Sequence, residues 1–316
     1  MADIKKLATR EGYAEGLIEL GAKRDDIIVL DADLAAATKT GAFKKAYPDK
    51  FYNCGIAEQN MMSIAAGIAA TGKTVFASSF AMFAAGRAYE QVRNSIGYPN
   101  LSVNIGATHA GISVGEDGAT HQCCEDIALM RTIPGMTIIN PADAVEAKAA
   151  TLAAAEVDGP VYLRFGRLAV PVINDEATYK FELGKGITLE DGTDVTIIAT
   201  GLMVERAQQA YEMLKAEGIS ARVINIHTIK PLDEEIVIKA AKETGAIVVA
   251  EEHSVIGGLG SAVAELLTEK YPVVIKKVGV EDEFGMSGPA VELLDIFGLN
   301  AENIVKKAKE AIAMKK

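Results

Sequence analysis

The chain has 316 residues, 49% of them hydrophobic and 24% charged, a composition typical of a globular protein of about two domains. Its net charge of -11 argues against nucleic-acid binding, because the phosphates would be repelled. No segment reaches the ~20 uninterrupted apolar residues of a membrane span, and the N-terminus lacks the apolar core of a signal peptide. The three cysteines fit neither a disulfide framework nor a zinc site, so we expect a cytoplasmic protein.

Helix and strand patterns alternate from the N-terminus to residue 164. Short apolar runs predict strands, and apolar residues at helical spacing predict helices. The expected strands are 27–30, 74–77, 101–105, 137–139 and 161–164, and the expected helices are 5–21, 61–70, 84–94 and 144–156. This alternation predicts a parallel sheet, with ligands at the carboxyl ends of its strands.

A segment rich in glycine, with Pro171 and an Asn-Asp pair, predicts a linker over 171–192 that separates a domain at 1–170 from one at 193–316. The second domain repeats the alternation, with strands at 195–199, 221–226, 246–250 and 273–278 and helices at 204–217, 234–243 and 259–269. The predicted fold class is therefore α/β, with two αβα domains built on parallel sheets.

Glu58 lies between a short strand-like segment and an apolar helix, with few charges around it. One interpretation is an exposed glutamate in the first helical turn, where it favours the helix dipole. The alternative is a partly desolvated carboxylate that hydrogen-bonds a ring nitrogen of a cofactor. The residue and its neighbours alone leave both interpretations open.

A glycine-rich loop over 106–118 follows the strand at 101–105, and it brings histidines and acids together in a short stretch. Glycines let such a loop turn sharply near a ligand, and histidine exchanges protons near neutral pH. His109 and His121 could instead cap helices in a solvated loop. A metal site formed by His109, Asp117 and His121 is a third possibility, weakened because no further ligand group accompanies them.

Two segments resemble those of transketolases. GIAEQNM, at 55–61, is similar to their G-I-R-E-H-x-M segment, and ATHAGISVGEDGATHQ, at 107–122, resembles their T-H-D-S-I-G-x-G-E-D-G-P-T-H-Q loop. The resemblance extends to the stretches at 31–34, 140–143 and 251–260, and so covers essentially the whole chain. It implies that 1–170 is a thiamine diphosphate pyrimidine-binding domain and that 193–316 is a transketolase C-terminal domain.

The resemblance implies roles for several residues at the cofactor. Glu58 would be catalytic and would hydrogen-bond N1′ of the thiamine aminopyrimidine. Phe80 and Phe83 would hold the pyrimidine ring, although their spacing also suits core packing. Asp33 matches an acid near the cofactor, and Gly86 stands where the family often has a third aromatic.

Further roles concern the substrate. His121 would assist proton transfer near the substrate oxygen, and Asp117 would bind a hydroxyl of the sugar acceptor. The sugar phosphate would be held by His109, Arg10 and Arg164, because the planar fork of arginine suits phosphate. Taken alone, Arg10 reads as a surface helix charge. Relatives place a phosphate-binding serine where this chain has Ala37. We interpret His227 and His253, in the second domain, as structural.

The family binds the cofactor diphosphate through Mg²⁺, with a G-D-G motif followed at a distance by Asn, and no such motif is found in this sequence. The resemblance therefore implies a split enzyme, with Mg²⁺ on a separate N-terminal subunit, no metal ligand in this chain and two copies of each chain. The leading interpretation is transketolase. The alternatives are a related ketol transferase, a deoxyxylulose-phosphate synthase-like enzyme or a non-catalytic binding protein. A 2-oxo-acid dehydrogenase β subunit is less favoured because an H-S-Q-type segment is missing.

Overall fold

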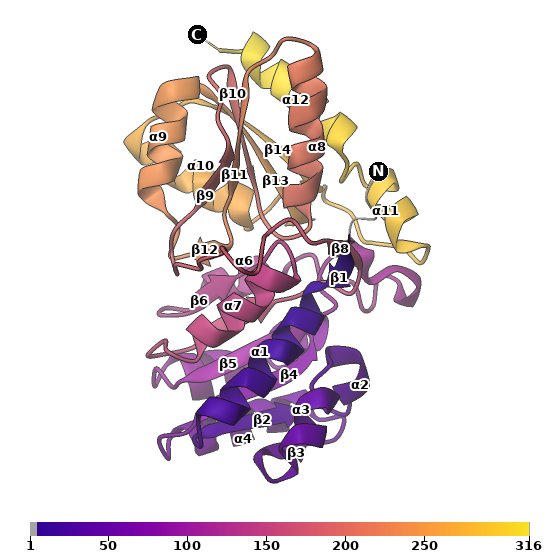
Figure 1. Cartoon of the computed structure of the whole chain (residues 1–316), viewed down its shortest axis with the longest axis vertical. Coiled ribbons are helices and arrows are strands. Elements are labelled where there is room, and N and C mark those ends of the chain that lie inside the picture. Colours follow the sequence, from indigo (N-terminus) through magenta and orange to yellow (C-terminus); the bar gives the residue numbers. More distant parts are fainter. Residues whose placement is uncertain (1–4, 316) are drawn as a thin grey trace.

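The computed structural model describes residues 5–315, which form two stacked parts, each a β-sheet with helices on its faces (Figure 1). The first half of the chain forms the lower part in this view, and most of the second half forms the upper part. No helix in the described range is long and apolar enough to cross a membrane.

The sheet of the lower part has seven strands in the order β12-β6-β7-β5-β4-β2-β3. All neighbouring pairs are parallel except β12–β6. In chain order the strands are β2 (Ile27–Asp31), β3 (Phe51–Asn53), β4 (Thr74–Phe80), β5 (Val103–Thr108), β6 (Thr137–Ile139), β7 (Val161–Arg164) and β12 (Thr228–Lys230).

Helices bury both faces of this sheet. One face packs against α1 (Thr9–Lys23) and α7 (Ala144–Ala154). The other packs against α4 (Glu58–Ala69), α6 (Asp126–Arg131) and a helical stretch in which π-helical turns at Met82–Arg87 and Val92–Gly97 flank α5 (Tyr89–Gln91). Successive side chains of β4 point to opposite faces of the sheet. Phe76 packs with residues of α1 and α7, whereas Val75 and Ala77 pack on the other face.

The sheet of the upper part has five strands in the order β14-β13-β10-β11-β9, of which only β9 is antiparallel to its neighbour. These strands are β9 (Ile187–Glu190), β10 (Val195–Ala199), β11 (Ala221–Asn225), β13 (Ala246–Ser254) and β14 (Val274–Val280). Its helices are α8 (Met203–Ala216), α9 (Glu234–Thr244), α10 (Leu259–Lys270), α11 (Ala290–Ile296) and α12 (Ala301–Ala313).

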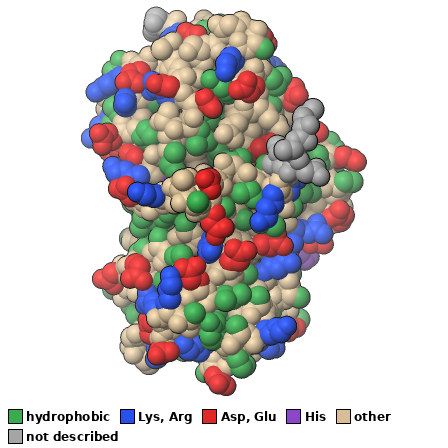
Figure 2. Space-filling view, in the orientation of Figure 1, with side chains coloured by type: hydrophobic (Ala, Val, Ile, Leu, Met, Phe, Trp, Pro, Cys, Tyr) green, Lys and Arg blue, Asp and Glu red, His purple; other side chains and the backbone are tan. Residues whose placement is uncertain are grey.

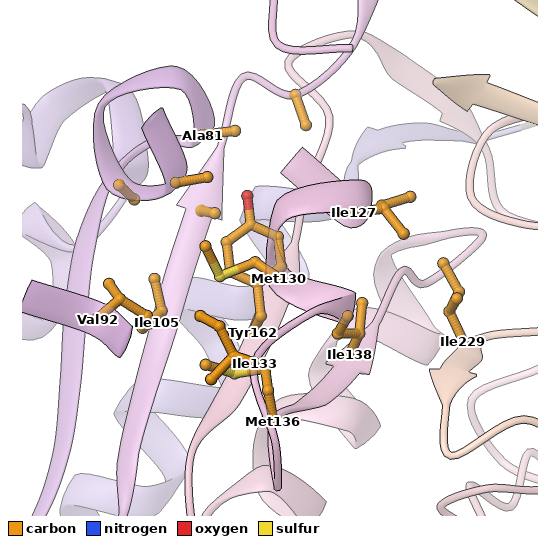
Figure 3. Close-up of a cluster of buried hydrophobic side chains, with 14 of the residues drawn as sticks. Ala81, Val92, Ile105, Ile127, Met130, Ile133, Met136, Ile138, Tyr162 and Ile229 are labelled. Atoms are coloured by element: carbon orange, nitrogen blue, oxygen red, sulfur yellow. The ribbon is translucent and has the colours of Figure 1, made fainter. Parts of the chain in front are cut away.

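One hydrophobic core is continuous through both parts. The cluster that contains Ile105, Met130 and Tyr162 of the lower part also includes buried residues of β10, β13 and α10. Figure 3 shows these side chains meeting between the sheet and its helices, with Ile229 of β12 at the side of the cluster. Strand β12 thus belongs to the first sheet although it lies within the range predicted for the second domain.

The predicted α/β class is confirmed, and in each of the two large sheets the antiparallel strand of the described range lies at an edge. The predicted linker is not a free segment, because β9 lies within it and adds an edge strand to the second sheet. Just before it, β8 (Ala169–Pro171) pairs with β1 (Lys6–Ala8). The sequence pattern also missed the short α2 (Ala35–Thr38) and α3 (Gly41–Ala46), as well as α11 and α12.

Strand register brings two segments of the candidate site together. In the pairing of β4 with β5, Phe80 lies opposite Thr108 at the carboxyl ends of the two strands. The residues that follow these ends, the Met82–Arg87 turn and His109, therefore lie beside each other. Strand β2 pairs with the other side of β4, so Asp33 also follows the same edge of the sheet.

Candidate active site

Glu58 is the first residue of α4 and is only 2% exposed, which excludes the interpretation of an exposed helix-dipole charge. Arg87 Nη1 donates to Glu58 Oε2 at 3.0 Å, and Ser79 Oγ lies 3.5 Å from Oε1. A buried carboxylate held by only two side chains from neighbouring elements is the arrangement expected of a group that can accept a ligand.

Arg87 lies against an aromatic ring while it holds Glu58. Its guanidinium carbon is 4.5 Å from the centroid of the half-buried Phe83 ring, within the range of a cation–π contact. The Arg87 side chain is 49% exposed, so the guanidinium is open to solvent on one side. A flat cation therefore occupies the position between the Glu58 carboxylate and the Phe83 ring.

The structure brings Phe80, Phe83, His109 and His121 into one cluster of rings. Phe80 stacks on His109 with a centroid distance of 3.8 Å, and its ring is 5.9 Å from that of Phe83. His121 approaches both phenylalanines edge-on, at 5.3 Å from Phe83 and 6.3 Å from Phe80. These four residues, predicted from distant parts of the sequence, form one aromatic wall, and Arg87 joins its Phe83 ring to Glu58.

His109 is a neutral imidazole in this cluster. Burial first, and then the charges of Arg10, Arg167 and His121, lower its pKa to about 3. Arg10 Nη1 lies 3.0 Å from His109 Nε2, and arginine can only donate. Nε2 is therefore the acceptor, and Nδ1 carries the proton and donates to Thr108 Oγ1 at 3.0 Å.

Two arginines converge near His109. Arg10 of α1 also donates to the Ala37 carbonyl at 2.9 Å, and its buried Nε has no hydrogen-bond partner among the residues described. Burial and then the charge of Arg167 lower the pKa of Arg10. Arg167 Nη1 donates at 2.6 Å to both the Val114 carbonyl and Glu116 Oε2. Two nearby guanidinium groups with an unpaired donor make a suitable place for an anion.

The structure does not bring Arg164 to this cluster, contrary to the prediction that it grips a sugar phosphate. Arg164 is 3% exposed, and its Nε donates to the fully buried Asp126 at 2.8 Å. Its Nη2 donates to the carbonyls of Glu252 at 2.9 Å and Cys123 at 3.3 Å. The guanidinium is enclosed between the two domains, so a sugar phosphate cannot reach it.

Asp117 and His121 bracket a tight turn that follows two short 3₁₀ turns within Ile112–Asp117, which a kink at Gly115 (φ +84°) separates. The turn passes through Gly118 at φ +73°, a conformation that favours glycine. The Asp117 side chain is exposed, while His121 is half-buried with its Nδ1 2.9 Å from Thr120 Oγ1. A cavity of about 650 Å³ adjoins this turn and is lined in part by Met82, Thr120 and Phe284.

Asp33 has a left-handed backbone, φ +65°, and an exposed side chain. Asn53 Nδ2 donates to its carboxylate at 2.8 Å, and the Asp33 amide donates back to Asn53 Oδ1 at 3.1 Å. The structure thus holds Asp33 at the edge of the sheet that carries the site. Within residues 5–315, no group of three or more His, Cys, Asp or Glu side chains could hold a metal ion.

Arg87 was not predicted from the sequence, and Arg164 was predicted where the structure places Arg167. For Arg87 the available signal was its position next to Gly86, where the resemblance placed an aromatic. Which of Arg164 and Arg167 faces outward depends on the end of β7 and on the distant Asp126, and no local pattern reveals it.

Two family descriptions divide the chain between them. "Transketolase, pyrimidine binding domain" matches residues 5–172, and "Transketolase, C-terminal domain" matches residues 184–304. The chain belongs to the transketolase family. Enzymes of this family use thiamine diphosphate with a divalent metal ion.

Several relatives of the chain are described as sections or subunits of transketolases. It is 53% identical over 95% of both chains to a putative transketolase C-terminal section from Methanocaldococcus jannaschii. It is 45% identical to a 6-deoxy-6-sulfo-D-fructose transketolase subunit from Clostridium sp. strain MSTE9, over 97% of this chain and 95% of that one.

A solved structure described as a split gene transketolase, inactive beta4 tetramer, superposes with a TM-score of 0.90 at 50% identity, covering 99% of this chain and 100% of the other. By contrast, the chain spans about half the length of longer transketolase relatives. It therefore corresponds to the C-terminal half of the undivided family members.

Proposed function

We propose that the chain is the C-terminal subunit of a thiamine diphosphate-dependent transketolase, which transfers a two-carbon ketol unit from a ketose phosphate to an aldose phosphate. The observation that carries this proposal is the buried Glu58 carboxylate beside the aromatic wall of Phe80, Phe83, His109 and His121. A carboxylate at one edge and aromatic faces at another are what an aminopyrimidine ring requires.

Arg87 supports the fit of that ring. Its planar guanidinium already makes a hydrogen bond to Glu58 and a face contact with Phe83, so the position accommodates a flat, nitrogen-rich group. We expect the aminopyrimidine to take the place of Arg87, with Glu58 hydrogen-bonded to N1′. When bound, the cofactor supplies the thiazolium carbon that accepts the ketol unit.

The remaining residues of the site would act on the sugars. His121, with Nδ1 held by Thr120, would exchange a proton with a substrate oxygen through Nε2. Asp117, on the exposed turn, would accept a hydrogen bond from a hydroxyl of the acceptor. Arg10 and Arg167 would bind the phosphate, and neutral His109 would hold the Arg10 guanidinium in place through Nε2. Arg167 takes the role first predicted for Arg164. Asp33 stays a predicted neighbour of the cofactor.

The diphosphate and its Mg²⁺ would belong to a separate N-terminal subunit. The relatives that are named as sections or subunits of transketolases support this proposal. We propose an α2β2 assembly with the cofactor between the chains. The three cysteines are free, as a reducing cytoplasm would require.

Reconstitution tests the proposal. The chain, mixed with its candidate N-terminal partner, Mg²⁺ and thiamine diphosphate, should transfer a ketol unit from a ketose phosphate to an aldose phosphate. The isolated chain should be inactive, and calorimetry should find no micromolar cofactor binding to it. Tight binding to the isolated chain would contradict the split-enzyme proposal.

Glu58→Gln provides the sharper control in the reconstituted enzyme. Glutamine still accepts a hydrogen bond from Arg87 but cannot exchange a proton, so activity should fall by roughly 10²–10⁴-fold with the fold unchanged. Activity within a few-fold of the wild type would show that another residue acts at N1′.

A related ketol transferase is the second candidate, since one relative is described as acting on 6-deoxy-6-sulfo-D-fructose. A sulfonate and a phosphate are both anionic, so the arginine cluster suits either. Comparing kcat/KM for phosphorylated and sulfonated ketoses decides between the two. Supplying pyruvate with an aldose phosphate tests the deoxyxylulose-phosphate synthase alternative, which predicts CO₂ release.

A further inference from the structure

The loop that carries Asp117 is fixed by a side chain of the terminal domain. The Ser113 amide, which lies before the Gly115 kink of the stretch Ile112–Asp117, donates to Glu252 Oε1 at 2.6 Å. Glu252 lies on β13 and is 4% exposed, so it crosses the domain boundary as a buried carboxylate. Its partner is 139 residues away in sequence.

The chain packs closely around this carboxylate. A Cβ at Gly111 would lie 2.3 Å from Glu252 Cδ, and Gly111 has φ +80°, so only glycine fits beside the carboxylate. The Gly111 amide donates to the Cys123 carbonyl at 2.9 Å, which closes the loop at its base. Arg164 then donates to the backbone carbonyls of Cys123 and Glu252, joining this base to β13.

Other parts of the terminal domain complete the support of the loop. Ile112 is fully buried within the hydrophobic cluster of that domain, together with residues of β14 and α11. Gln122 Nε2 donates to the Met286 carbonyl at 2.9 Å and to the Ile112 carbonyl at 3.1 Å. The loop is therefore held by the terminal domain as well as by Cys123, Gln122 and Arg167 of the first domain.

We propose that Glu252 is a positioning residue for the acceptor: its carboxylate fixes the Ser113 amide and, across the Gly115 kink, limits where Asp117 can lie. This inference rests on the proposed function for its effect on catalysis, but its effect on the loop is independent of that function. The terminal domain then has a role in the reaction although Glu252 touches no substrate.

Glu251 provides a matched control on the same strand. It is 1% exposed, and its carboxylate also accepts from backbone amides, those of Leu259 at 2.6 Å and Gly260 at 2.7 Å. Those amides begin α10 within the terminal domain. Replacing Glu251 therefore removes a buried carboxylate and its hydrogen bonds to backbone amides, but leaves the contacts of residues 112–117 unchanged.

The first measurement is amide hydrogen exchange of residues 112–117 in the isolated full chain. Glu252→Ala and the more conservative Glu252→Asp, which keeps the charge but is one carbon shorter, should each speed exchange of this segment by roughly ten- to hundred-fold. Glu252→Gln should restore protection, since its oxygen still accepts from Ser113. Glu251→Ala should leave the segment protected.

The second measurement uses the reconstituted enzyme. Glu252→Ala should lower kcat/KM for hydroxylated acceptors by roughly ten- to hundred-fold and leave the KM of the donor within a few-fold of the wild type. Suppose that amide exchange is faster in Glu252→Ala but that neither the wild type nor any variant transfers ketol units. The proposed function then fails, while the contact between Glu252 and the loop stands. Equal exchange in Glu252→Ala, Glu252→Asp and Glu251→Ala, or an unchanged acceptor KM and kcat in Glu252→Ala, would overturn the inference.

Discussion

Two arginine–carboxylate pairs in this chain have similar lengths and opposite surroundings. Arg87 and Glu58 are 3.0 Å apart, and the arginine side chain is 49% exposed although the glutamate is only 2% exposed. Arg164 and Asp126 are 2.8 Å apart, and their side chains are 3% and 0% exposed. The first pair lies in the proposed cofactor site and the second between the domains. The exposure of the arginine, and not the distance between the charges, therefore distinguishes the two pairs. A ligand can replace the exposed arginine, whereas the fold depends on the buried one.

Most charged side chains on the molecular surface are exposed to water, as Arg87 is, and not enclosed as Arg164 is. Figure 2 shows acidic and basic side chains interspersed over this face, with no large patch of one sign. Such pairs contribute little to stability because water solvates both partners. Arg164 differs because its guanidinium is surrounded by protein and its partner Asp126 also accepts from the Tyr162 hydroxyl at 2.9 Å.

Removal of Arg164 should give the largest effect. Arg164→Ala leaves the Asp126 charge buried without its partner, so the free energy of unfolding should fall by about 3–5 kcal/mol in chemical denaturation. The double variant Arg164→Met with Asp126→Leu should recover part of this loss. A loss below about 1 kcal/mol for Arg164→Ala would mean that burial does not distinguish the two pairs.

Arg167→Ala should give the next largest effect, and it should act on substrate rather than on stability. We expect KM for a ketose phosphate donor to rise about ten- to hundred-fold, since charge-assisted bonds to phosphate contribute roughly 1.5–3 kcal/mol. KM for unphosphorylated hydroxypyruvate should change little. Arg222→Ala is the control, because Arg222 pairs with Asp191 and Glu243 in the terminal domain. Equal losses with both donors would indicate a structural defect instead.

Glu252 should make stability depend on pH. Burial raises the pKa of Glu252 to about 7, against the opposing effects of Arg164 and Ser113. Because the folded chain holds this proton more tightly than the unfolded chain, stability from this group is present below about pH 4.5 and lost as pH rises through 7. Glu252→Gln should therefore lessen the loss of unfolding free energy between pH 5 and pH 8 by about 2 kcal/mol. Parallel pH profiles of the two proteins would contradict this assignment.

Arg87→Ala should give the smallest effect and sharpen the comparison with Arg164. The pair should contribute about 1 kcal/mol, because Arg87 is half-exposed and water can enter its place to solvate the otherwise buried Glu58 carboxylate. Cofactor affinity of the reconstituted enzyme should rise about two- to five-fold, since a competing contact is lost. A tenfold fall in affinity would instead show that Arg87 binds the cofactor.

The sequence predicts the elements whose signal is local and misses those that depend on distant partners. Strands such as β2 and β10 are apolar runs because helices cover both their faces, and such runs can be recognised in the sequence alone. Strands β9 and β12 lie at sheet edges, where three or four residues carry too weak a pattern. Helix α12 was missed although its polar and apolar faces are distinct, because the prediction ended at residue 278.

The candidate site shows the same division. The segments with Glu58, His109, Asp117 and His121 were found because their order along the chain resembles a known family. The π-helical turns at Met82–Arg87 place Arg87 in the site, and the hydrophobic periodicity of the sequence did not predict these turns. The contact of Glu252 with Ser113 joins residues 139 positions apart, so only the folded chain brings them together.

Strand β12 has a consequence for protein engineering. It is encoded after residue 227 yet completes the sheet formed by the first 164 residues, and Lys230 Nζ also donates to the carbonyls of Arg131 and Ile133. A chimera that joined the front of this chain to the back of a relative would import a foreign strand into its own first sheet. A crossover between residues 171 and 192 would therefore fall inside a cooperative unit, and recombination among relatives should succeed more often when the whole chain is exchanged.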